Sequence, residues 1–289
     1  VGVVAGGPYW CANGNVLVAT QNCMKYPNLI VVDELVAATA YAASLLSIDN
    51  PYVIQDHKVW LFSGTKDTVV VSGVVRKLET YYKHFVNEEN IETVFDIPAE
   101  HSFVTDLYGN SCDQLETPFL SNCHFDSAGA ILQHIHGQLK PRVPANNDSI
   151  VTLRQASFMP AWVITGKEVG LYDYAYAYIP PQCKNGTYCK IHVAFHGCLQ
   201  TVADVGDQFV VYAGYNEWAE NNNFIILYPQ ALANSLNPEG CFDWWGYSGA
   251  DYATKLGAQM ATVKNMVDYL INLIEKGLDK YDGEGTYIA

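Results

Sequence analysis

Hydrophobic positions in the first hundred residues alternate between short continuous runs and longer stretches with helical spacing. Short apolar or aromatic runs that break into turn residues are typical of strands buried on both faces of a parallel sheet. Such runs predict strands at Val1–Ala5, Val59–Ser63 and Thr93–Ile97, and helical spacing predicts helices at Glu34–Leu46 and Val70–Glu88. Strands that alternate with helices in this way indicate a doubly wound α/β fold.

The second half of the chain carries a further set of strand and helix patterns. A helix capped by Asp126 or Ser127 leads into a polar surface connection over Gln138–Ser149. Strands are predicted at Gly170–Ile179, Lys190–Phe195 and Phe224–Tyr228, and a last helix at Ala258–Lys276. The apolar stripe of that helix follows helical spacing and comprises Met260, Val263, Met266, Val267, Leu270 and Leu273.

The charge balance narrows the classes of partner. The 289 residues carry a formal net charge of −14, and no cluster of Lys and Arg offsets repulsion from an anionic polymer, so nucleic acid is not an expected partner. The longest apolar stretch, 29–46, contains Asp33 and Glu34 and is too short and polar to cross a membrane. We expect a monomer that acts on a neutral substrate, with any secretion signal removed or upstream of Val1.

The eight cysteines fall into local pairs that favour disulfides in an oxidising compartment. The local pairs are Cys11–Cys23, Cys112–Cys123 and Cys183–Cys189, which leaves Cys198–Cys241, although many other connectivities are formally possible. Zinc ligands or buried free thiols are the alternative, which the lack of any CxxC spacing makes weaker. Two glycosylation sequons, at Asn147 and Asn185, agree with a secreted protein, although such triplets also arise by chance.

Two strand ends each deliver one titratable side chain. Asp67 follows the strand at Val59–Ser63, and His101 follows the strand at Thr93–Ile97 and lies 34 residues after Asp67. An acid and then a histidine at successive strand ends are two members of a Ser/Asp/His set on a parallel sheet. The alternative for Asp67 is a helix cap or a turn, and the alternative for His101 is an ordinary loop or core histidine.

A third feature is the His196-Gly197 turn, which follows a predicted strand. In α/β-hydrolases a loop of this kind supplies a backbone N–H to the oxyanion hole, and here the donor would be Cys198. A disulfide from Cys198 to Cys241 would fix this donor before substrate arrives. The alternative is an ordinary glycine turn held by a structural disulfide.

The order of these features departs from the usual hydrolase chain, in which the oxyanion loop and nucleophile precede the acid and histidine. A circular permutation, with the old termini joined near Gln138–Ser149, accounts for the order. It also predicts that the nucleophile strand and its serine are missing from the 289 residues. Ser248 lies in a Gly-Tyr-Ser-Gly-Ala segment but follows a Trp-rich loop, and Ser63 is better explained as a turn residue.

Several motifs together resemble the secreted poly(3-hydroxybutyrate) depolymerases of the single-domain, circularly permuted α/β-hydrolase type. The motifs are Ala5–Tyr9 (AGGPY), Ser63–Thr68 (SGTKDT), His101–Phe103 (HSF), Asn122–Ala130 (NCHFDSAGA), His192–Gln200 (HVAFHGCLQ), Gly214–Ala219 (GYNEWA), Ile225–Ala231 (IILYPQA) and Gly240–Trp244 (GCFDW). They cover nearly the whole length, and all eight cysteines fit. The resemblance implies one α/β-hydrolase catalytic domain over residues 1–289.

The resemblance also implies residue roles and a chemistry. Asp67 and His101 would be the acid and base, the N–H of Cys198 an oxyanion donor, and Trp244 with Trp245 the apolar contact for a polyester strand. Ester hydrolysis through an acyl-serine needs no metal or organic cofactor. Two alternatives are an esterase for feruloyl or acetyl groups on plant polysaccharide, and a polymer-binding protein without a nucleophile.

Overall fold

The computed structural model describes residues 1–184 and 187–276 and divides into two compact units. The first unit comprises Val1–Gln138 and Trp244–Leu256, and the second comprises Leu139–Asp243 and Gly257–Ala289. Asn185, the acceptor of the second predicted sequon, lies outside the described residues. The single catalytic domain over 1–289 stays a prediction.

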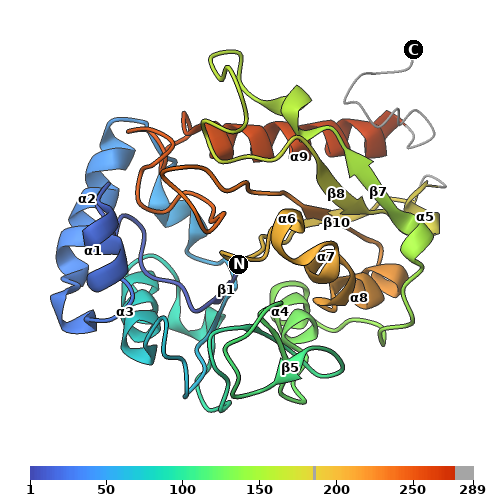
Figure 1. Ribbon diagram of the computed structural model, residues 1–289, viewed down its shortest axis with the longest axis horizontal. Coiled ribbons are helices and arrows are strands. Elements are labelled where there is room, and N and C mark those ends of the chain that lie inside the picture. Colours follow the sequence, from blue (N-terminus) through green and yellow to red (C-terminus); the bar gives the residue numbers. More distant parts are fainter. Residues whose placement is uncertain (185–186, 277–289) are drawn as a thin grey trace. The chain divides into compact units, whose positions relative to one another are not determined.

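The first unit contains a parallel sheet of three strands, of which Figure 1 labels β1. Its order is β1 (Gly2–Val4), β2 (Val59–Phe62) and β3 (Ile91–Val94), with β2 parallel to both neighbours. All four residues of β2 are buried, as a continuous apolar run in a parallel sheet predicts. The strand at the middle of this sheet is therefore the one that leads to Asp67.

Four α-helices belong to the same unit. They are α1 (Val16–Gln21), α2 (Val32–Ser44), α3 (Ser72–Tyr82) and α4 (Ser127–His136). Helix α3 presents Val75 and Leu78 to the core cluster that contains β2 residues Val59 and Leu61. This helix is shorter than the predicted Val70–Glu88, because a turn precedes Ser72 and non-α turns follow Tyr82. Helix α4 begins as predicted, with the Asp126 side chain accepting the N–H of Gly129 at 2.8 Å.

The first unit also contains short elements that the hydrophobic pattern did not predict. The 3₁₀ turns are η1 (Pro27–Leu29), η2 (Pro51–Ile54) and η3 (Glu88–Asn90). A second parallel sheet has the order β4 (Phe103–Thr105), β6 (Leu120–Asn122) and β5 (Asn110–Ser111). Strands of two or three residues are too short to show a period, so they leave no signal in the sequence.

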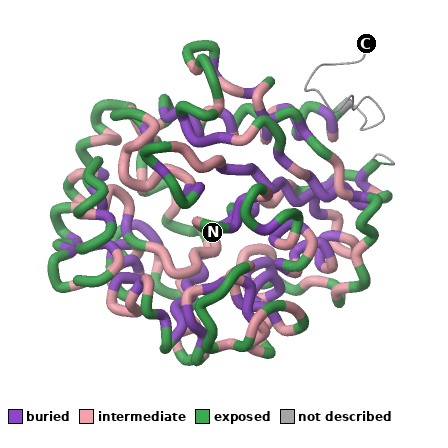
Figure 2. The backbone as a smooth tube through the Cα atoms, viewed as in Figure 1, coloured by how far each residue is buried: buried purple, intermediate pink, exposed green. Residues whose placement is uncertain are grey.

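The second unit contains a four-stranded sheet of mixed direction. Its order is β7 (Ile150–Leu153), β8 (Ala175–Tyr178), β10 (Phe224–Tyr228) and β9 (Lys190–Val193). Strand β8 is antiparallel to both of its neighbours, β7 and β10, whereas β10 and β9 are parallel. The prediction of a mostly parallel sheet is therefore wrong for the two pairings that β8 makes. Strand β10 is buried throughout (Figure 2).

The helices of the second unit range from single turns to one long helix. They are α5 (Pro181–Lys184), α6 (Val202–Val205), α7 (Gln208–Tyr212), α8 (Tyr215–Asn222) and α9 (Ala258–Lys276), with η4 (Asn147–Ser149) and η5 (Gln155–Phe158) as 3₁₀ turns. The bounds of α9 are the predicted ones, and Met266, Leu270 and Leu273 are fully buried. Met260 is 55% exposed, so its place in the apolar stripe was wrong. Across residues 1–184 and 187–276, no helix is long and apolar enough to cross a membrane.

Candidate active site

The end of β2 lies against the segment that follows β3, and a glycine permits this approach. The N–H of Thr65 donates to the carbonyl of Ile97 at 2.8 Å, and the N–H of Lys66 donates to the carbonyl of Ala99 at 3.2 Å. A Cβ atom on Gly64 would lie 2.1 Å from the carbonyl oxygen of Ala99. Only glycine allows two backbones to come this close. The two strand ends that were predicted to carry an acid and a base are therefore held together.

The carboxylate of Asp67 divides its two oxygens between a turn and a histidine. Oδ1 accepts the N–H groups of Val69 at 2.9 Å and Val70 at 2.8 Å, and Oδ2 lies 2.9 Å from Nδ1 of His101. The side chain is only 2% exposed. The turn interpretation of Asp67 is therefore confirmed, and the second oxygen meets the imidazole; a catalytic role for Asp67 stays a prediction.

The hydrogen bond to Asp67 determines which nitrogen of His101 is available for chemistry. A carboxylate oxygen can only accept, so Nδ1 carries the proton in this contact and Nε2 is the basic nitrogen of the neutral ring. The side chain of His101 is 33% exposed. This arrangement is the one in which an acid orients a histidine that acts as a general base.

The serine that would pair with this base stays a prediction. No serine hydroxyl in the described part of the first unit lies within hydrogen-bonding distance of His101. Ser63 is fully buried at the end of β2, and its hydroxyl has no partner among the described residues. Ser248 follows a segment without strand structure, so it lacks the strand-to-helix turn of a nucleophile elbow.

Glu100 is a buried carboxylate that sequence reasoning missed. One of its oxygens, Oε2, accepts the N–H groups of Thr68 at 3.1 Å and His101 at 2.7 Å. Burial alone would raise the pKa of Glu100, but hydrogen bonds from Thr68 and His101 outweigh it and lower the pKa below its usual value. Its position beside His101 in the chain was the available signal.

The predicted His-Gly turn lies in the second unit, and all but one of the N–H groups over 197–200 have acceptors. The N–H of Gly197 donates to Oε1 of Gln200 at 2.8 Å, and the N–H of Leu199 donates to the carbonyl of Glu239 at 2.7 Å. The N–H of Gln200 donates to the carbonyl of Gly197 at 3.3 Å. Within the part of the chain that the structure describes, the N–H of Cys198 has no acceptor.

His196 holds this turn through hydrogen bonds of both ring nitrogens. Its Nδ1–H donates to the carbonyl of Gly197 at 2.7 Å, and its Nε2 accepts the N–H of Ala231 at 3.1 Å. The ring is 4% exposed and packs on Phe242, with centroids 4.9 Å apart. Burial lowers the pKa of His196 to about 4, more than the hydrogen bond to Gly197 raises it. The imidazole is therefore neutral at pH 7 and links the backbone at Gly197 to the backbone at Ala231.

A disulfide and one asparagine hold the other side of the turn. Cys198 is bonded to Cys241. The buried Asn237 donates through Nδ2 to the carbonyl of Cys241 at 2.8 Å and accepts the N–H of Cys241 at 3.0 Å. The turn that carries the Cys198 N–H is thus fixed by covalent and polar contacts.

Trp244 and Trp245 lie in the first unit, in the same unit as Asp67 and His101. The two rings meet edge to face with centroids 5.6 Å apart, and both pack on the cluster formed by Ala12, Ala19 and Cys23. Both tryptophans are half-buried. Their contact with a substrate stays a prediction.

No family model matches the chain. It is 45% identical over 269 residues to a poly(3-hydroxybutyrate) depolymerase of Delftia acidovorans, over 92% of this chain and 53% of that protein. It is 33% identical over 289 residues to a polyhydroxybutyrate depolymerase of Talaromyces funiculosus, over 94% of this chain and 81% of that protein. The chain belongs to the polyhydroxybutyrate depolymerase family.

Solved structures agree with membership of the depolymerase family. The crystal structure of the depolymerase from Penicillium funiculosum matches with a TM-score of 0.81 and 32% identity, over 96% of this chain and 86% of that one. A serine-to-alanine variant of a depolymerase, complexed with an R3HB trimer, matches with the same TM-score and coverage. The mixed α/β fold of this chain is therefore shared with solved depolymerases, whereas the chain spans about half the length of the Delftia protein.

All eight cysteines of this depolymerase-family chain are in disulfides. The bonds are Cys11–Cys23, Cys112–Cys123, Cys183–Cys189 and Cys198–Cys241, the pairs expected from the sequence. Over 1–184 and 187–276, no three His, Cys, Asp or Glu side chains group as a metal site. The cysteines therefore serve as covalent links between neighbouring segments.

Proposed function

We propose that this protein hydrolyses the ester bonds of poly(3-hydroxybutyrate) or a related polyhydroxyalkanoate to short hydroxyacids. The observation that carries the proposal is the 2.9 Å contact between Asp67 and His101 in a chain of the depolymerase family. An orienting acid and a base with a defined tautomer are the parts that acyl transfer through a serine requires.

In the proposed reaction a serine hydroxyl attacks the ester carbonyl while Nε2 of His101 removes its proton. The tetrahedral intermediate collapses as His101 protonates the departing hydroxyl, which leaves an acyl-serine. Water then attacks the acyl-serine while His101 removes its proton, and His101 returns this proton to the serine as the hydroxyacid leaves. Asp67 keeps the Nδ1 proton in place throughout and stabilises the imidazolium.

The N–H of Cys198 is the proposed donor to the oxyanion. It is the N–H in its turn that has no acceptor in the described residues, and His196, Gln200 and the Cys241 disulfide hold the turn. A donor fixed before the reaction stabilises the oxyanion without reorganisation.

Trp244 and Trp245 are the proposed contacts for the polyester. A neutral, apolar chain is best bound by aromatic surface rather than by charged groups. The solved relative with an R3HB trimer supports a short hydroxybutyrate segment as the bound unit.

We propose that the nucleophile is a serine outside the 289 residues, which is the arrangement that a circularly permuted hydrolase requires. The described serines of the first unit support this, because none bonds to His101. The serine replaced by alanine in the relative with the trimer supports the residue type. We further propose secretion, since four disulfides are typical of an oxidising compartment.

Release of 3-hydroxybutyrate from polymer films by the natural gene product tests this function. We expect release, together with labelling of one serine by a fluorophosphonate and loss of both in a His101→Gln variant. The labelled peptide identifies the serine. Films that stay intact, or a natural product of 289-residue mass that takes up no label, would contradict the proposal. Recovery of the protein from medium rather than cells tests secretion.

A further inference from the structure

We infer that Glu100 is a positioning residue that aligns the proposed acid with the proposed base, an inference that rests on the proposed function. Its Oε2 atom joins two backbone N–H groups, one from Thr68, which follows Asp67, and one from His101 itself. A single oxygen atom therefore holds the loop of the acid and the loop of the base at one point.

Neither N–H has a second acceptor among the described residues. In the described residues, Glu100 is the only acceptor for the N–H of Thr68 and for the N–H of His101. Hydrogen bonds to a charged acceptor are shorter and roughly twice as strong as neutral ones. Without the carboxylate both groups need water or a new partner, and the two loops lose their common anchor.

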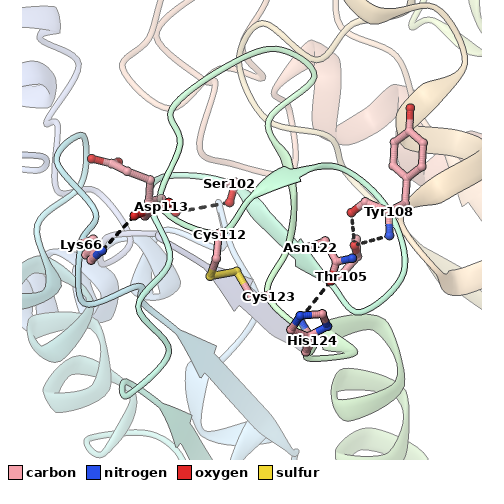
Figure 3. Close-up of a disulfide and its surroundings, with 10 residues drawn as sticks. Lys66, Ser102, Thr105, Tyr108, Cys112, Asp113, Asn122, Cys123 and His124 are labelled. Atoms are coloured by element: carbon pink, nitrogen blue, oxygen red, sulfur yellow. Dashed lines mark hydrogen bonds and ion pairs between the residues drawn. A yellow bond between two sulfur atoms is a disulfide. The ribbon is translucent and has the colours of Figure 1, made fainter.

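The backbone of Glu100 is itself fixed, so the carboxylate is a stable reference point. Its N–H donates to the carbonyl of Cys112 at 2.9 Å, and its carbonyl accepts from Oγ of Ser102 at 3.3 Å. Cys112 is bonded to Cys123 (Figure 3). Glu100 is 8% exposed, which limits competition from water.

The alternative is that Glu100 stabilises the fold without affecting how Asp67 meets His101. Three substitutions separate the two roles. Glu100→Gln keeps an oxygen that can accept both N–H groups, Glu100→Asp is one methylene too short to reach both, and Glu100→Ala removes the acceptor. Thr39→Val is the matched control, because it removes a buried hydrogen bond to Tyr81 that lies in no proposed site.

The readout on this chain is the Nδ1 proton of His101 in NMR spectra, assigned by its loss in His101→Gln. We expect the resonance to persist in Glu100→Gln and Thr39→Val and to disappear by exchange in Glu100→Asp and Glu100→Ala. In the catalytically active gene product, the same two variants should lower kcat roughly 10–100-fold with little change in KM.

Retention of the resonance in Glu100→Asp and Glu100→Ala would overturn the inference, as would equal loss in Glu100→Gln. If Glu100→Ala does not fold, the comparison of Asp with Gln decides. The NMR readout needs no turnover. A gene product that hydrolyses no ester would therefore refute the proposed function and leave the positioning of His101 by Glu100 to be decided separately.

Discussion

Single residues in this molecule perform two tasks by dividing their atoms between them. Asp67 gives one oxygen to the turn before α3 and the other to His101. His196 donates through one ring nitrogen and accepts through the other, which requires the neutral ring. In both cases the fixed half of the side chain determines the geometry of the other half.

Replacement of Asp67 by Asn tests this division at the proposed base. The amide oxygen can still accept from the turn, but an NH₂ group then faces His101 and favours the wrong tautomer. We expect kcat for ester hydrolysis to fall roughly 10³–10⁴-fold with the thermal midpoint nearly unchanged. Asp113→Asn is the control, because Asp113 forms an exposed ion pair with Lys66 of the same loop. Wild-type kcat in Asp67→Asn would refute the role of Asp67.

His196 predicts a pH dependence of stability. Burial lowers its pKa from 6.5 to about 4 in the folded protein, so between these values the unfolded chain binds a proton that the folded chain does not. The neutral His196 therefore contributes roughly 3 kcal/mol to the free energy of unfolding above pH 6.5. This contribution is lost as the pH falls toward 4. Urea unfolding at pH 7 and pH 4 should show this component in wild type and lack it in His196→Gln; equal pH dependence in both would contradict it.

At the scale of elements, the site depends on how closely β2 and the segment after β3 approach. Gly64 sets that distance, since a Cβ there would lie 2.1 Å from the carbonyl oxygen of Ala99. The clash is with backbone, which cannot rotate away as a side chain can. The close approach of the two backbones therefore favours glycine at position 64.

Gly64→Ala should separate the two loops and destabilise the protein. We expect a loss of about 1–3 kcal/mol, typical of overpacking, together with weakening of the Asp67–His101 contact. Denaturant unfolding measures the first effect, and the Nδ1 proton of His101 reports the second. Gly7→Ala is the control, because the nearest atom to its Cβ would be 3.5 Å away. Equal stability of the two variants would rule out Gly64 as the determinant.

Elements with a clear period could be predicted from the sequence, and those without one could not. The bounds of α9 follow from its spacing, and β2 follows from its continuous apolar run. The reversed direction of β8 could not be predicted, because an apolar run indicates a buried strand but not which way it runs beside its neighbours. Met260 was included for its apolar side chain, but it is exposed because the buried face of α9 continues through the polar residues Gln259 and Thr262.

The candidate site shows the same limit. Asp67 and His101 could be proposed as a pair because each follows a recognisable strand, and their separation in sequence leaves room for one crossover. Glu100 could not be found in this way, because it accepts backbone N–H groups, which every residue except proline possesses. The sequence indicates chemistry through side chains, whereas positioning through the main chain appears only in the structure.

At the scale of the whole molecule, the disulfides differ in the length of chain they close. Cys198–Cys241 spans 43 residues and Cys183–Cys189 spans 6. If the bonds act by restricting the unfolded chain, removal of the longer link by double Cys→Ser substitution should lower the unfolding free energy by about 4 kcal/mol, against about 2 kcal/mol for the shorter. Urea unfolding of both double variants measures the difference. A larger loss for the 6-residue loop would show that strain or packing dominates.

The residues that align the acid with the base lie close together along the chain, and this affects the order of folding. They are Gly64, Asp67, Glu100 and His101. The contacts that align the acid with the base join residues 64–70 to residues 97–112, on either side of a single crossover helix. A short loop closes faster and with less loss of entropy than a long one. The acid–base pair is therefore a local product of one strand–helix–strand unit, and it can form as soon as that unit does.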